Sequence, residues 1–127
     1  MNTKQTVGPK QVGAFLEERV RRLGDDAPIF YGELAAHLSL PPVTDAWFTH
    51  PLCSIFEQLD IEDAKLGRPF RTALVISRER SMPGDGFFKT YLQLHPNVRP
   101  PKNDHDKMRL YLDELNGVIA HYKNPVS

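Results

Sequence analysis

This sequence contains very little cysteine and carries no net charge. One cysteine occurs among the 127 residues, so the chain cannot form an internal disulfide. The 16 Lys and Arg residues balance 16 Asp and Glu residues, which gives a formal net charge of zero. A balanced charge removes the strongly basic composition that is typical of nucleic-acid-binding domains, although a local basic patch can still act within a neutral protein.

Long apolar runs are also missing. No stretch approaches the ~18 apolar residues of a membrane span, and the opening segment MNTKQTVGPKQ has no apolar core of a signal peptide. Together with the single cysteine, these absences predict a cytoplasmic protein without a membrane partner. The composition is 40% apolar and 25% charged, which is ordinary for globular proteins. We therefore expect one domain over residues 1–127, with residues 1–7 frayed.

Apolar residues recur at helical spacing in four segments, which are therefore predicted helices. The segments are residues 9–23, residues 32–38, a third that follows Pro41 and Pro42 and ends at Gly67, and residues 104–123. Pro9 suits the first turn of the first helix, and Gly24 suits its end. The two prolines stop the second helix, because proline lacks the backbone N–H that a helix needs.

A strand and a tight turn follow the third predicted helix. Residues 68–77, RPFRTALVIS, predict a strand because their centre is apolar on both faces. The turn SRERSMPGDG ends in Gly84, Asp85 and Gly86, and residues 87–94 then fit either a second strand or a short helix. This order predicts an α+β fold of winged-helix type: a three-helix core, a β-hairpin wing and an additional C-terminal helix.

Three short motifs carry a resemblance to known proteins: YGELA at residues 31–35, ALVIS at 73–77 and PGDGFF at 83–88. The pattern resembles small bacterial and phage-encoded winged-helix proteins and, more distantly, the DNA-binding domain of alkylguanine alkyltransferases and alkyltransferase-like proteins. That resemblance implies DNA binding, with Tyr31 contacting a phosphate beside the recognition helix. The alkyltransferase motif Pro-Cys-His-Arg is replaced by RPFRT at residues 68–72, so alkyl transfer is not expected. The arginine that the family places in its recognition helix is also absent.

Residue types in the third helix and the following turn suit DNA. One face of the helix carries His50, Ser54 and Gln58 at intervals of four residues, and Ser and Gln can pair with base edges. Arginine holds phosphate through two parallel hydrogen bonds, because its guanidinium is a planar fork. The strand and the turn supply four arginines: Arg68, Arg71, Arg78 and Arg80. Together with Tyr31, these residues form the predicted duplex-DNA site of a non-enzymatic protein.

A second hypothesis is a protein-interaction module, such as a phage or mobile-element regulator or inhibitor, that uses the same scaffold to bind a protein partner. The third helix also carries four acids that would repel phosphates, namely Glu57, Asp60, Glu62 and Asp63. The distribution of charge separates the two hypotheses. Arginines gathered on one face favour DNA, whereas acids interleaved with them, or an exposed apolar patch, favour a protein partner.

Residues for catalysis or metal binding do not cluster in the sequence. Cys53 follows His50 by three residues, but a nucleophilic pair needs a third group to orient the base. A structural zinc site needs four ligands, and no second close Cys or His pair is present. The GDG of residues 84–86 lacks the spacing of a dinucleotide site. We therefore expect no enzymatic activity, no cofactor and no metal, and the oligomeric state stays open.

Overall fold

The computed structural model describes residues 7–44 and 47–123 of the chain, and all of its helices and strands belong to those residues. The fold is α+β, as predicted. The α-helices are α1 (Pro9–Leu23), α2 (Tyr31–His37), α3 (Pro51–Lys65), α4 (Asp85–Leu94) and α5 (Asp104–Lys123). Short 3-10 helices are η1 (Gly24–Asp26), η2 (Trp47–Thr49) and η3 (Arg71–Leu74), and the strands are β1 (Ile29–Phe30) and β2 (Val75–Ile76). Six of the seven residues that we expected to fray, residues 1–6, lie outside the described part.

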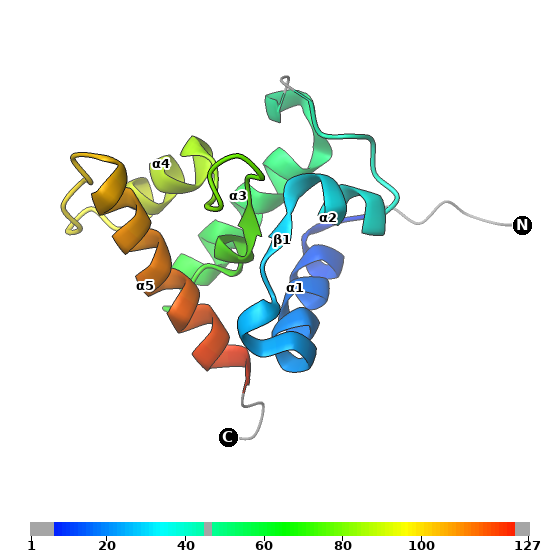
Figure 1. Ribbon diagram of the computed structural model, residues 1–127, viewed down its shortest axis with the longest axis horizontal. Coiled ribbons are helices and arrows are strands. Elements are labelled where there is room, and N and C mark those ends of the chain that lie inside the picture. The colour runs from blue at the N-terminus through cyan, green and yellow to red at the C-terminus, as the bar shows by residue number, and fades with distance from the viewer. Residues whose placement is uncertain (1–6, 45–46, 124–127) are drawn as a thin grey trace, which may run out of the picture.

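Helices α1 and α5 pack against each other, and helix α3 packs against α1 and α4 (Figure 1). Its inward face carries apolar side chains at helical spacing, and helices α1 and α5 add their own stripes to the same core. The largest of the fully buried side chains are Phe70, Leu16, Leu34, Leu52, Leu59 and Leu74. No helix of the described residues is long and apolar enough to cross a membrane.

The predicted strand over residues 68–77 is found only in part, because four of its residues form a 3-10 helix and two form a strand. Residues Arg71–Leu74 form η3, and the only strand in this segment is β2, which pairs in parallel with β1. The backbone N–H groups of Phe70 and Arg71 donate to the carboxylates of Glu114 and Asp63, at 2.7 and 3.0 Å. Because side chains satisfy these donors, the part of the segment that precedes β2 is buried without a neighbouring strand.

The β-hairpin wing is not found among the described residues, which corrects that part of the prediction. The loop after β2 closes on itself, since the N–H of Ser77 donates to Met82 O at 2.8 Å. Residues 87–94 then belong to helix α4, which settles the choice between strand and helix. The acidic Asp85 in the first turn favours a helix start, and Phe87 and Phe88 on the inward face are buried.

A buried ion cluster joins α1, α3 and η3. The side chain of Arg71 is 5% exposed, and its Nη1 and Nη2 atoms lie 2.8 Å from Glu17 and 2.7 Å from Glu62. Its Nε atom donates to Asp63, which is fully buried. Burial alone would lower the pKa of Arg71, but the hydrogen bonds to Asp63 and Glu62 outweigh burial and raise that pKa. The charge is therefore kept in the interior because acids surround it.

Glycine at position 13 lets α1 approach this cluster closely. A Cβ atom placed on Gly13 would overlap the Arg71 guanidinium, which its carboxylate partners hold in place. Gly117, in the middle of α5, differs because its Cβ would meet only Pro69, at an ordinary contact of 3.5 Å. The two helical glycines thus have different reasons to be present.

We predict opposite effects for two identical substitutions. Gly13→Ala should lower the free energy of unfolding by about 1–3 kcal/mol, the usual range for overpacking. Gly117→Ala should raise it by about 0.5–1 kcal/mol, because alanine is the better helix former. Urea unfolding of both variants measures these changes. Equal gains in stability at both positions would show that Arg71 is not held against α1.

Candidate functional site

His50 is the N-cap residue of α3. Its Nδ1 atom accepts a hydrogen bond from the N–H of Leu52 at 3.1 Å, so the other ring nitrogen, Nε2, donates to Pro41 O at 2.7 Å. The imidazole is stacked on Trp47 and is 7% exposed. His50 is therefore an N-cap rather than a member of an exposed face with Ser54 and Gln58. These two are exposed, and Gln58 Nε2 donates to Ser54 Oγ at 3.2 Å.

The four predicted phosphate-binding arginines are divided by the fold. Arg71 belongs to the buried cluster, and Arg68 pairs with the acids of the same cluster, with Nη2 3.2 Å from Glu62. Arg78 and Arg80 lie in the exposed loop between β2 and α4. The guanidinium of Arg78 lies 4.2 Å from the centre of the Phe30 ring, whereas Arg80 is 3.7 Å from Asp85. The loop pair is thus the accessible part of the predicted set.

Acids also accompany the arginines of α1. Arg21 lies 3.7 Å from Glu17 and 3.5 Å from Glu18, and Arg22 lies 3.9 Å from Glu18. Arg19 instead donates to the backbone carbonyls of the segment that follows η1. Positive and negative groups are therefore interleaved on this helix, so its arginines do not form a separate basic patch.

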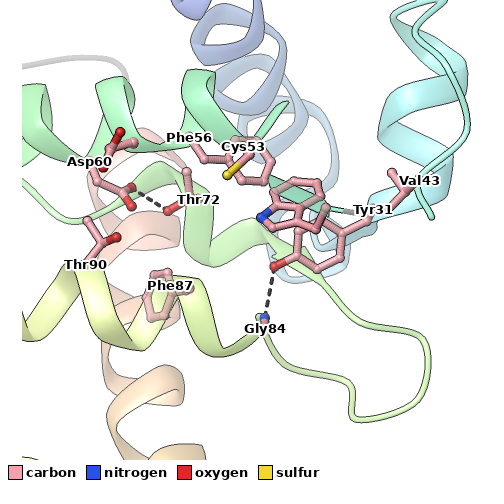
Figure 2. A pocket seen from close by; sticks show the side chains of 12 residues that line it. Tyr31, Val43, Cys53, Phe56, Asp60, Thr72, Gly84, Phe87 and Thr90 are labelled. Atoms are coloured by element: carbon pink, nitrogen blue, oxygen red, sulfur yellow. Dashed lines mark hydrogen bonds between the residues drawn. The ribbon is translucent and has the colours of Figure 1, made fainter. Parts of the chain in front are cut away.

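A cavity of about 220 Å³ lies where α2, η2, α3 and α4 meet (Figure 2). Its walls carry four aromatic side chains, and the only cysteine and the only tryptophan of the chain both line it. The lining residues are Tyr31, Val43, Trp47, Cys53, Phe56, Glu57, Asp60, Thr72, Gly84, Gly86, Phe87 and Thr90. Glu57 and Gly86 are exposed, so the cavity opens to solvent on their side.

Tyr31 fastens two walls of the cavity to each other. Its hydroxyl oxygen accepts a hydrogen bond from the N–H of Gly84 at 2.9 Å, which links α2 to the start of α4 (Figure 2). The ring lies 5.2 Å from Trp47, edge to face. Burial raises the pKa of Tyr31, and the bond from Gly84 offsets only part of that rise. The hydroxyl of Tyr31, which was predicted to contact a phosphate, therefore already accepts a hydrogen bond from Gly84.

Asp60 is the buried acid of the cavity. Its side chain is 3% exposed and accepts a hydrogen bond from Thr72 Oγ1 at 2.6 Å. Burial raises its pKa to about 8; the bond from Thr72 opposes the shift, and the negative charges of Asp63 and Glu114 add to it. At about pH 7 the carboxyl is therefore mostly protonated. Arg71 contributes a smaller opposing effect.

Two of the four acids that were expected to repel phosphates, Asp60 and Asp63, are buried instead of lying on the surface of α3. The signal was available, since Asp60 follows Phe56 by four residues and Leu59 by one, within the apolar stripe of α3. Trp47 was missed because it lies in a 3-10 helix of three residues, which is too short to show a periodicity. Comparisons with protein-family models, curated protein sequences and solved structures found no match. In the part of the chain that the structure describes, no group of His, Cys, Asp or Glu side chains could hold a metal ion.

The raised pKa of Asp60 predicts a specific dependence of stability on pH. The folded protein keeps the proton of Asp60 up to about pH 8, whereas an unfolded aspartate releases it at about pH 3.9. The contribution of the Asp60 carboxyl to the free energy of unfolding is therefore fully present at low pH. It falls by up to about 1.4 kcal/mol per pH unit as the pH rises towards about 8.

Asp60→Asn should abolish that fall, because asparagine resembles the protonated carboxyl and does not titrate. Relative to the wild type, we expect the variant to become steadily more stable between about pH 5 and about pH 8. Urea unfolding at several pH values measures the difference, with the exposed Asp113→Asn as the matched control. A difference between Asp60→Asn and wild type that stays constant with pH would contradict the assignment.

Proposed function

We propose that this chain is a non-enzymatic protein-interaction module whose aromatic cavity receives one side chain of a protein partner. The observation that carries the proposal is the cavity itself: apolar walls, a few polar groups and an opening to solvent. Its volume of about 220 Å³ lies below the roughly 300–1,000 Å³ of sites for drug-sized ligands. A group as small as one side chain therefore suits it.

The distribution of charge also supports a protein partner. Arg21, Arg22, Arg68 and Arg71 each pair with acids, and Glu57 and Glu62 lie on the exposed side of α3. Phosphates would be repelled along that helix. Exposed apolar side chains near its end, Ile61 at 50% and Leu66 at 60%, add surface that a protein can cover.

The single cysteine provides the test. Peptides selected from a random displayed library should share one residue type, and their binding should be lost when Cys53 carries a bulky maleimide group that fills the cavity. Cys53→Ser is the matched control, since that variant has no thiol to react and should bind peptide before and after treatment. A failed selection, or peptides that bind regardless of the maleimide, would count against the proposal.

Duplex DNA is the second candidate partner, and the exposed loop favours it. Arg78 and Arg80 are two accessible arginines two residues apart in an exposed turn, away from the buried cluster. They could follow a phosphate backbone if the winged-helix resemblance extends to α1, α2 and α3. Asp85 and Glu79 beside them reduce the local positive charge.

We predict that DNA binding, if it is the function, depends on the loop. The double variant Arg78→Ala, Arg80→Ala should lower affinity at low salt and reduce the slope of log affinity against log salt by about two, one for each phosphate contact. The double variant Arg21→Ala, Arg22→Ala, whose arginines already pair with acids, is the control and should change little. Fluorescence anisotropy with labelled duplex reports both. Absence of binding at low salt would eliminate this candidate.

A further inference from the structure

We propose that the cavity is selective for an organic cation, an alkylammonium group carried by a lysine side chain or by a free amine. The lysine source rests on the proposed function, whereas the free amine does not. Three independent features of the lining support a cation: the aromatic rings, the sign of the charged groups and the small apolar volume. Ligands with and without the lysine backbone separate the two sources.

The aromatic rings supply the first feature. Tyr31, Trp47, Phe56 and Phe87 all line the cavity, and Trp47 lies 5.2 Å from the Tyr31 ring and 5.7 Å from the Phe56 ring. The faces of aromatic rings are negative, so they attract ammonium groups, most strongly when water is displaced. Rings grouped around one cavity resemble the aromatic cages that recognise quaternary ammonium groups.

The charged groups supply the second feature. Two carboxyl groups line the cavity, Asp60 at its buried end and Glu57 at its exposed side, and none of the lining residues is Lys, Arg or His. A phosphate or a carboxylate would therefore find no cationic side chain among the lining residues. A cation would approach past Glu57 and meet Asp60 at the inner end, with attraction increasing as water is excluded.

The volume supplies the third feature. About 220 Å³ is several times the ~30 Å³ that one water molecule occupies in the liquid, so a short chain of heavy atoms fits. Side chains such as Val43 and Phe87 offer apolar contact to a methylene stem, while the acid receives the charged end. A lysine side chain and a short alkylamine both have this division into an apolar stem and a charged end.

Protonation of Asp60 makes the selectivity measurable. The free protein holds this carboxyl mostly protonated, so entry of a cation favours ionisation, and the proton released from the carboxyl passes to solvent. Binding should therefore strengthen as the pH rises towards about 8. The groups that face or influence Asp60 are Thr72 and Arg71 from η3, Asp63 and Glu57 from α3, Glu114 from α5, and Tyr31 and Thr90 across the cavity.

Trp47 is the only tryptophan, and its position in the lining makes its fluorescence a direct reporter of the cavity. The probes are Nα-acetyl-lysine methylamide, its ε-trimethylated form, its neutral ε-acetylated form and n-butylamine. We expect the two cationic lysine derivatives to bind and the ε-acetylated form to bind at least tenfold more weakly. Affinity should rise by up to about tenfold per pH unit below about pH 8, the limit for release of one proton.

Two variants test the acids separately. Asp60→Asn should weaken cation binding at least tenfold and remove the dependence on pH, and unfolding curves confirm that the variant is folded. Glu57→Lys changes an exposed residue and places a like charge at the opening, so it should also weaken binding. Asp113→Lys, an equally exposed change on α5, is the matched control and should leave affinity unaltered.

The results distinguish a lysine side chain from a free amine, and they distinguish failure of the cation proposal from failure of the proposed function. Stronger binding of the lysine derivatives than of n-butylamine indicates a side chain of a partner, and equal binding indicates a free amine. The cation proposal is overturned if the ε-acetylated form binds as tightly as lysine, if affinity does not change with pH, or if no cation binds. Selected peptides that depend on the cavity but share a neutral residue would keep the interaction module and overturn only the cation.

Discussion

The ion cluster around Arg71 and Asp63 is the interaction on which the rest of this structure depends. Asp63 accepts hydrogen bonds from the side chain and the backbone of Arg71, and Arg71 also reaches Glu17 on α1. One side chain thereby fixes α1, α3 and η3 relative to one another. Removal of either buried partner would leave an uncompensated charge, at a cost of about 3–5 kcal/mol. The cluster therefore determines the position of α3, which in turn supplies one wall of the cavity.

Asp60 and Asp63 lie one turn apart on α3 but have different environments because of that cluster. Asp63 lies against Arg71 and Arg68 and keeps its charge compensated. Asp60 is turned towards the cavity, where it accepts a hydrogen bond from the Thr72 hydroxyl and burial raises its pKa to about 8. An acid in this condition is a poor contributor to stability near neutral pH, and perturbed acids in a cavity are typical of functional sites. The contrast between the two positions is the physical basis for regarding the cavity as the site.

Local patterns predicted the helices well, whereas long-range partners decided the rest. The helix over residues 104–123 could be predicted from the spacing of its own apolar residues, and α5 has those bounds. The strand over residues 68–77 was only partly right, because Asp63 and the distant Glu114 take the backbone donors that a strand would share. An arginine looks the same in a sequence whether an acid or a phosphate receives it. The sequence therefore predicted Arg71 and Arg78 equally as phosphate-binding residues, but in the fold Arg71 is buried and Arg78 lies in an exposed loop.

The two surfaces considered for binding are physically connected. The loop that carries Arg78 and Arg80 ends at Gly84, whose N–H donates to Tyr31 in the cavity wall. Asp85, which lies between two residues that line the cavity, pairs with Arg80 and also lies 3.5 Å from Lys107 of α5. A partner that inserts a side chain between the aromatic rings would therefore contact, or lie next to, the arginine loop. Acidic groups beside a lysine in the partner would suit that loop, so one segment of mixed charge could engage both surfaces.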